Sequence, residues 1–275
     1  MANITASAVN ELRQRTGVGM MDCKKALVEC DGDMDKAIDY LREKGQKLAS
    51  KRADRDASEG CVLSATTDDK TFGAVIMINC ETDFVAKNED FIAFTHLVLN
   101  TAISSKAKTA SQVNALVIDG STVENLIIEQ VAKIGEKIEL SKYETIEAPV
   151  VYSYIHPGNR LATIVAFNKT GFDAQGHDVA MQIAAMAPLA LDKTTITADI
   201  IEKEMEVYRG QVREEGKPEN MVEKIAEGKL NKFFKESTLL SQDFIKDSKK
   251  NVLQYLQEGD KELTATAFYR LALGA

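Results

Sequence analysis

The stretch TFGAVIMINCETDFVAKNEDF, residues 71–91, decides the fold of this chain. Its first half, Thr71–Cys80, is a nearly continuous run of β-forming residues, which predicts a buried strand. Apolar side chains then recur at helical spacing and predict a helix over 88–103. Between the strand and the helix, Asp83 stands in front of Phe84. A core phenylalanine would be ordinary at such a corner, but the aspartate would not. The corner is therefore either a structural turn or a functional tip.

The pattern of a hairpin followed by a helix occurs twice. A β-rich run over 60–67 precedes the strand at 71–80, and residues 68–70 form the predicted turn. Sliding the sequence by 88 residues places 61–102 on 149–190, with turn on turn. The identical pairs are Val62 and Val150, Ala74 and Ala162, Ile76 and Ile164, Thr82 and Thr170, Phe84 and Phe172, Ala86 and Ala174, Asp90 and Asp178, and Ala102 and Ala190. We therefore predict an α+β fold with two related units whose sheets are antiparallel.

The two copies differ at the corner itself. The first reads TDFVA and the second TGFDA, so the threonine and the phenylalanine are shared. Because both copies contain these two residues, we expect a structural role for both: the threonine supports the turn and the phenylalanine packs against the core. Asp83 distinguishes the first copy, because the second has Gly171. The comparison raises the question of whether Phe84 points outward while Phe172 points into the core.

The N-terminal part of the chain predicts three short helices. The first begins after Thr5 and stops at Gly17, the second carries Met20 and Met21, and the third is capped by Asp33 and ends at Gly45. Helices this short must share a core to be stable. The pattern alone favours burial of at least one of the two methionines in that core. The polar residues 46–59 are expected to form a linker.

The remaining segments predict a return strand, a helical hairpin and a tail. A helix over 123–134 precedes a strand-like alternation at 137–148. Residues 197–216 and 218–234 each carry a narrow apolar stripe, and Gly216-Lys217-Pro218 separates them sharply. This arrangement predicts an antiparallel helical hairpin that projects from the body. The tail predicts a helix over 249–257 and a final strand over 262–273.

Composition and charge exclude several classes of protein. The chain has 275 residues, 44% of them hydrophobic and 28% charged, which is ordinary for a globular protein of about two domains. The net charge of -8 argues against a protein that holds phosphate backbones, so no direct nucleic-acid partner is expected. The first 15 residues lack the features of a signal peptide, and no apolar run is long enough to span a membrane. We expect a cytoplasmic protein with no membrane partner.

No catalytic constellation emerges from the sequence. The four cysteines, Cys23, Cys30, Cys61 and Cys80, form no C-x-x-C pair, and the three histidines do not fall at metal-ligand spacings with them. His156 lies in the predicted turn before Pro157, where a lone histidine is usually exposed and not catalytic. We therefore expect no catalytic residue, no metal site and no cofactor. A chain with several separate modules is better suited to binding another protein at several points than to catalysis.

At this point the residues carry a family resemblance. The segments ITASAVNELRQRTGVGMMDCKKAL, INCETDFVAKNEDF and VAKIGEKIEL resemble bacterial elongation factor Ts, in that order and at suitable spacing. YIHPGNRLATIV and AMQIAAMAPLAL resemble later blocks of the same family. The resemblance implies a non-enzymatic exchange factor that binds elongation factor Tu, both GDP-bound and nucleotide-free. It leaves a homodimer and a heterotetramer with that partner open as alternatives.

The resemblance also implies domains and site residues. Residues 1–54 would form a ubiquitin-associated-like domain with its linker, 55–140 the first core subdomain, 141–192 with 237–275 the second, and 193–236 a coiled-coil hairpin. The motif Thr82-Asp83-Phe84-Val85 would disturb the partner's magnesium and nucleotide site. The residues expected to contact the partner elsewhere are Arg13, Met20, Met21 and His156.

Two other classes of function stay open on the residues alone. One is an adaptor whose N-terminal helices bind a ubiquitin-like or other helical partner, in which case the fragment 1–44 would hold the main partner alone. The other is a thiol or metal enzyme that uses Cys23, Cys30 or Cys80. Full activity of an all-serine variant without bound metal would exclude it.

Overall fold

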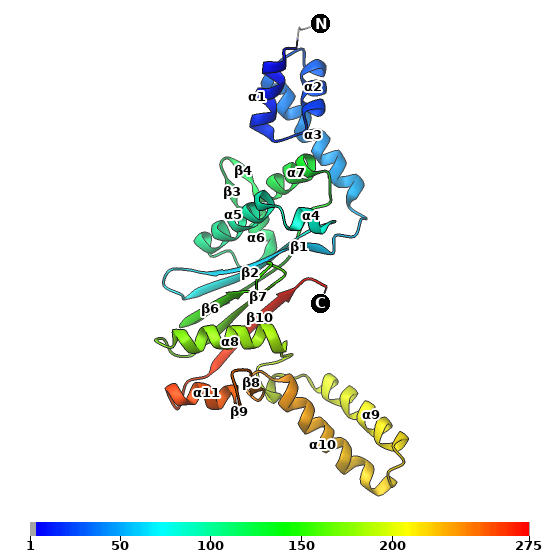
Figure 1. The fold of residues 1–275 in the computed structure, drawn as a ribbon, viewed down its shortest axis with the longest axis vertical. Helices are drawn as coiled ribbons and strands as arrows, with labels where there is room; N and C mark the ends of the chain where they lie inside the picture. Colours follow the sequence, from blue (N-terminus) through cyan, green and yellow to red (C-terminus); the bar gives the residue numbers. More distant parts are fainter. Residues whose placement is uncertain (1–3, 275) are drawn as a thin grey trace.

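The computed structural model describes residues 4–274, and its centre consists of two three-stranded antiparallel sheets (Figure 1). The first sheet has the order β1-β2-β5 and the second β10-β7-β6. The bounds of these strands are β1 Glu59–Thr66, β2 Phe72–Cys80, β5 Glu139–Glu147, β6 Val150–Ile155, β7 Leu161–Phe167 and β10 Ala265–Ala272. In each sheet a hairpin is followed by helices, and a later strand pairs with the hairpin's second strand. The α+β class is confirmed, and the shared strand order agrees with the repeat read from the sequence.

The two sheets pack face to face and helices cover their outer faces (Figure 1). Between the sheets lies an apolar layer that includes Val75, Val151 and Ile164. The sheets approach so closely at Gly73 that a Cβ there would lie 2.6 Å from Val151 Cγ1, so only glycine fits. The helices on the first sheet are α4 Asp83–Ala86, α5 Glu89–Ser105, α6 Ala110–Ala115 and α7 Val123–Ile134, and those on the second are α8 Asp173–Met186 and α11 Val252–Gly259.

Short elements connect these layers. They are the ribbon of β3 Val117–Ile118 with β4 Ser121–Thr122, the ribbon of β8 Asp243–Phe244 with β9 Asp247–Asn251, and the 3-10 turn η1 Lys193–Thr195. The expected border between the core units at residue 140 falls inside β5. Since β5 pairs with β2 from Phe72 to Asn79, residues up to 147 belong to the first sheet. The next strand, β6, pairs with β7 in the second sheet.

The N-terminal helices are α1 Ala6–Thr16, α2 Met20–Glu29 and α3 Met34–Arg52. Their first residues follow the local signals in the sequence: Thr5 Oγ1 accepts from the N–H of Ala8, and Asp33 accepts from the N–H of Lys36. Gly17 ends α1 in the left-handed conformation, with φ of 67°. The three helices bury a common apolar cluster, as predicted: Val9, Leu12, Val18, Cys23, Ala26, Leu27, Ala37 and Leu41.

The third helix does not end at Gly45, and that prediction is wrong. It continues to Arg52, so residues 46–52 are helical and are not a linker. Gly45 is buried where α3 crosses α7, and a Cβ there would lie 3.0 Å from Ala132 Cβ. The glycine therefore permits a close helix–helix approach and does not act as a stop. Tertiary packing here outweighs the low helix propensity of glycine.

Two further helices extend away from the sheets at the opposite end from the N-terminal helices (Figure 1). They are α9 Ala198–Glu214 and α10 Glu219–Ser237. Both lie side by side, with four inner residues buried: Met205, Val212, Val222 and Ala226. Arg209 binds Glu223 through two hydrogen bonds of 2.7 Å, which adds a polar contact beside the apolar seam. The predicted tail helix also begins later than expected, at Val252, because β9 occupies 247–251.

Candidate functional site

The corner after β2 exposes its aromatic residue and anchors its neighbours. Thr82 has extended backbone angles and caps the single turn α4, whose second residue is Phe84. The Phe84 side chain is 83% exposed, whereas Val85 packs against the core of the first sheet. Asp83 is half-buried at the start of the same turn. The corner thus packs against the core through Val85 and exposes Phe84 to solvent.

The second copy turns its phenylalanine the other way. Phe172 is half-buried and packs against the core beneath the second sheet. The preceding Gly171 has φ of 89°, a left-handed conformation that an aspartate rarely adopts, and α8 starts only at Asp173. In the first copy Asp83 instead begins a right-handed turn. The two copies therefore differ both in the backbone before the phenylalanine and in the exposure of its ring.

Two carboxylates brace the corner. Glu136, in the loop after α7, accepts hydrogen bonds from the N–H of Glu81 at 3.1 Å, the N–H of Thr82 at 3.0 Å and the Thr82 hydroxyl at 2.7 Å. Glu81 accepts in return from the N–H of Lys137 at 2.6 Å and from the guanidinium of Arg52 at 2.6 Å. Partial burial opposes ionisation of Glu81, but these donors hold its pKa below the ordinary value.

The Asp83 carboxylate is ionised and paired within its own turn. Lys87 Nζ donates to Asp83 Oδ2 at 2.6 Å. This hydrogen bond and the charge of the lysine lower the pKa of Asp83. Both side chains are more than a third exposed, so water screens the pair and it adds little to stability.

The β6–β7 turn lies at the same end of the molecule as the corner. Arg160, just after this turn, pairs with Glu59, and Glu59 lies opposite Cys80 in the β1–β2 ladder. Hydrogen bonding to Glu59 raises the pKa of Arg160, and the nearby Asp83 carboxylate adds to that effect. His156 in the turn is exposed, as predicted, and its Nδ1 lies 3.0 Å from the Tyr154 hydroxyl. The fold therefore brings His156 and the corner to one edge.

The predicted contact residues of the N-terminal helices form a separate surface. Met20 is 51% exposed and Met21 75%, so the expectation that one of them is a core residue is wrong. They occupy the first turn of α2, just before Cys23, which lies with Leu27 in the shared core. Arg13 on α1 is exposed as well. The N-terminal helices lie beyond α7, so this surface is set apart from the corner at α4 (Figure 1).

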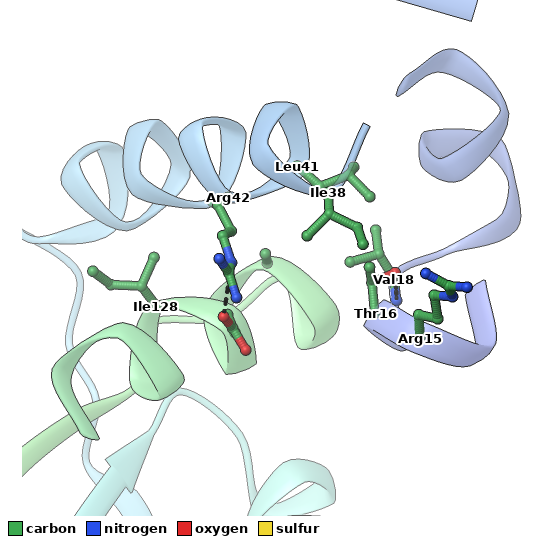
Figure 2. A pocket seen from close by; sticks show the side chains of 10 residues that line it. Arg15, Thr16, Val18, Ile38, Leu41, Arg42 and Ile128 are labelled. Carbon is green, nitrogen blue, oxygen red and sulfur yellow. Dashed lines mark hydrogen bonds and ion pairs between the residues drawn. The ribbon is translucent and has the colours of Figure 1, made fainter. Parts of the chain in front are cut away.

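A groove marks the seam between the N-terminal helices and the core. Figure 2 shows that its lining combines apolar side chains with two arginines, among them Val18, Ile38, Leu41, Ile128, Arg15 and Arg42. Arg42 Nε donates to Glu129 Oε1 of α7 at 3.2 Å across the seam. Both side chains are more than a third exposed, so this pair contributes at most ~1 kcal/mol. The close packing at Gly45 holds the seam together more strongly than this pair.

Two of the four cysteines, Cys61 and Cys80, are buried between the first sheet and its helices. Burial raises the pKa of Cys61 to about 11, and burial with the nearby Glu136 carboxylate raises that of Cys80 to about 12. Both thiols are therefore protonated near neutral pH, whereas a reactive cysteine needs a thiolate. Within residues 4–274, no three histidine, cysteine, aspartate or glutamate side chains group as a metal site would need. In the same range no helix is both long and apolar enough to cross a membrane.

The sequence singled out Phe84 but did not mark the two carboxylates that hold its turn. Glu81 and Glu136 stand inside segments that carry the family resemblance, but nothing in their local pattern marks a role. The hydrogen bonds of Glu136 join residues 54 and 55 positions apart in the chain. Glu136 follows Gly135 at the end of a helix, where an acidic residue is usually an ordinary surface residue. Its contact with Thr82 becomes visible only in the tertiary structure.

Comparison with known proteins gives a consistent result. The sequence model of a family described as "Elongation factor TS" matches residues 81–275. A protein named Elongation factor Ts from Christiangramia forsetii is 49% identical to this chain, over 100% of both chains. One of the same name from Amoebophilus asiaticus is 50% identical over 99% of both chains, and one from Chloroherpeton thalassium is 45% identical over 100% of this chain and 99% of its own.

Proposed function

This chain belongs to the elongation factor Ts family, and on that premise we propose that it is a guanine-nucleotide exchange factor for elongation factor Tu. It binds the GDP-bound partner, promotes release of GDP and is displaced as GTP enters, in the cytoplasm during translation elongation. The exchange involves no covalent step. A factor that binds the nucleotide-free partner more tightly than the GDP-bound partner lowers, by the same ratio, the partner's affinity for GDP.

The observation that carries the proposal is the exposure of Phe84 on an anchored turn. A large aromatic side chain that is 83% exposed gains little for the folded chain. Rigid exposed aromatics are, by contrast, the residue type that most often dominates binding between proteins. Since Thr82 and Val85 are held on the core side, Phe84 can be presented in one direction.

The mechanism follows from how such partners hold GDP. Mg²⁺ and backbone N–H groups around the phosphates supply most of the grip in nucleotide-binding switches. We infer that the Thr82-Asp83-Phe84-Val85 motif enters near the magnesium and nucleotide site, where the ring of Phe84 favours a conformation with those contacts broken. Contacts elsewhere stabilise the strained partner. We assign them to Arg13, Met20, Met21 and His156, which are all exposed.

The same proposal gives each part of the chain the role that membership of the family implies. The first 54 residues act as a ubiquitin-associated-like domain that reaches the partner's nucleotide domain. The two sheets form the two core subdomains, with a border just before β6. The pair α9 and α10 is the coiled-coil arm of the family. The supporting observations are the shared apolar cluster of α1–α3 and the narrow seam between α9 and α10.

A GDP-release assay tests the proposal. Elongation factor Tu loaded with fluorescent GDP is mixed with this protein and excess unlabelled nucleotide, and the loss of fluorescence is followed in time. The release rate should rise with protein concentration and then saturate. Because coupling is reciprocal, added GDP should also dissociate the nucleotide-free complex. A release rate that stays at its spontaneous value at micromolar protein would contradict the proposal.

A further inference from the structure

We propose that Glu136 is a positioning residue for exchange: it fixes the backbone of the corner so that Phe84 is presented in one orientation. The inference rests on the proposed function for its kinetic consequence, but its structural part stands on the geometry alone. One carboxylate satisfies three donors of two consecutive corner residues, at 3.1, 3.0 and 2.7 Å. Few surface carboxylates hold so much of one short segment, and hydrogen bonds to a charged acceptor are among the stronger ones.

The position of these donors explains the effect on Phe84. Thr82 is the cap of α4, and its side-chain oxygen also accepts from the N–H of Val85 at 3.5 Å. When Glu136 holds both the N–H and the hydroxyl of Thr82, the residue that caps the turn is fixed. A helical turn of four residues has no stability of its own, so its geometry depends on such external contacts. Phe84 is the second residue of that turn.

Glu81 extends the same brace to α3. Its carboxylate accepts from the N–H of Lys137, next to Glu136, while its own N–H donates to Glu136. The two segments therefore exchange carboxylate-to-backbone hydrogen bonds in both directions. Arg52, in the last turn of α3, closes the arrangement at 2.6 Å from Glu81 Oε1. The corner is thus tied both to the loop before β5 and to α3, the helix that connects α1 and α2 to the first sheet.

The second copy also connects its corner to the loop before its third strand, but through different contacts. Lys169 stands where the first copy has Glu81, and its Nζ contacts Asp260 at 2.9 Å and Glu262 at 2.8 Å, just before the third strand. The Lys169 contacts join side chains only, while the neighbouring Asn168 side chain hydrogen-bonds the backbone of Glu262 and Thr264 in that loop. In the first copy Glu136 binds the backbone of the corner itself, and this is the copy whose phenylalanine is exposed. The copy with the exposed phenylalanine is thus the one in which a carboxylate holds the corner backbone. Holding a binding residue in one conformation lowers the entropy cost of binding.

The test compares Glu136→Ala and Glu136→Gln with the wild type and with Glu147→Ala as a control. Glutamine keeps an oxygen for the two N–H groups and an amide for the Thr82 hydroxyl, whereas alanine keeps neither. Glu147 is an exposed acid at the other end of β5, paired with Lys108. Three quantities are measured: the GDP-release rate at saturating protein, the protein concentration at half saturation, and hydrogen exchange of the Thr82 amide.

The brace predicts a specific pattern in these quantities. For Glu136→Ala, the saturating rate should fall by about tenfold or more, since small misplacement of a reacting contact is costly. The half-saturating concentration should change by less than about threefold, because the remote contacts remain. The Thr82 amide should exchange faster while amides of β2 keep their protection. Glu136→Gln should restore most of the rate, and Glu147→Ala should match the wild type.

Several outcomes would overturn the inference. An alanine variant with the wild-type saturating rate per folded molecule would do so, as would an unchanged Thr82 amide. A loss of rate explained wholly by a lower folded fraction would assign Glu136 a structural role only. If the alanine variant does not fold, Glu136→Asp takes its place, because it keeps the charge but is too short for both donors of Thr82. If the wild type itself fails to accelerate GDP release, the proposed function fails, and hydrogen exchange still decides the role of Glu136.

Discussion

Replacing Phe84 by alanine should remove most of the exchange activity and almost none of the folding stability. A phenylalanine side chain can bury ~200 Å². Since Phe84 is 83% exposed, only ~35 Å² of that area is covered in the free protein. At ~25 cal/mol per Å², the substitution should lower the free energy of unfolding by less than ~1 kcal/mol.

The effect on exchange should be much larger. If the partner covers the remaining ~165 Å², the same coefficient gives ~4 kcal/mol as an upper value for the contact in the complex. Truncated aromatic hot spots commonly cost ~2–4 kcal/mol. The GDP-release rate at low protein concentration should therefore fall by about 100-fold. The assay is stopped-flow release of fluorescent GDP, with calorimetric unfolding of the same samples.

Two control variants separate the alternatives. Phe91 is 1% exposed on α5, so Phe91→Ala should lower the free energy of unfolding by ~3–5 kcal/mol. Val117 is 62% exposed on β3, across the helical layer from α4, so Val117→Ala should change neither quantity. The reasoning is refuted if Phe84→Ala destabilises as strongly as Phe91→Ala, or if its folded fraction exchanges nucleotide at the wild-type rate.

Three further predictions follow from other parts of the molecule. Replacing Met20 and Met21 together by alanine should weaken the complex with nucleotide-free elongation factor Tu about tenfold by calorimetric titration, with thermal unfolding nearly unchanged; unchanged affinity would remove this surface from the proposal. Gly45→Val should lower the free energy of unfolding by ~1–3 kcal/mol, because its side chain meets Ala132 across the α3–α7 seam. Gly210→Val, where a Cβ meets nothing within 4 Å, is the matched control and should lose no stability, because valine has a higher helix propensity than glycine; equal losses in both variants would contradict the role of the contact with Ala132. Asp69 accepts hydrogen bonds from the threonine hydroxyls and a backbone N–H of the β1–β2 turn, which lower its pKa to about 2. Its stabilising contribution should be complete above the ordinary carboxyl pKa of about 4 and be lost as the pH falls toward 2; an NMR titration midpoint near the ordinary value would contradict this.

Local signals predicted most of the elements correctly. Thr5, Gly17 and Asp33 start and end helices by hydrogen bonds within one turn, so a short window of sequence contains the whole cause. The repeat with its offset of 88 residues likewise predicted two related units, and both sheets show the same strand order. Gly45 shows the limit of such reasoning, because its partner Ala132 lies on a helix that is distant in the chain.

A threonine and a phenylalanine after the second strand of each unit are visible in the sequence as a repeated corner. The sequence also singled out Asp83 against Gly171 as the difference between them. Only the tertiary structure decided that Phe84 points to solvent while Phe172 covers the core. The physical reason is that backbone propensity acts over a few residues and can start a turn, whereas its orientation is held by a carboxylate more than 50 residues away. That contact exists only after β5 has returned to pair with β2.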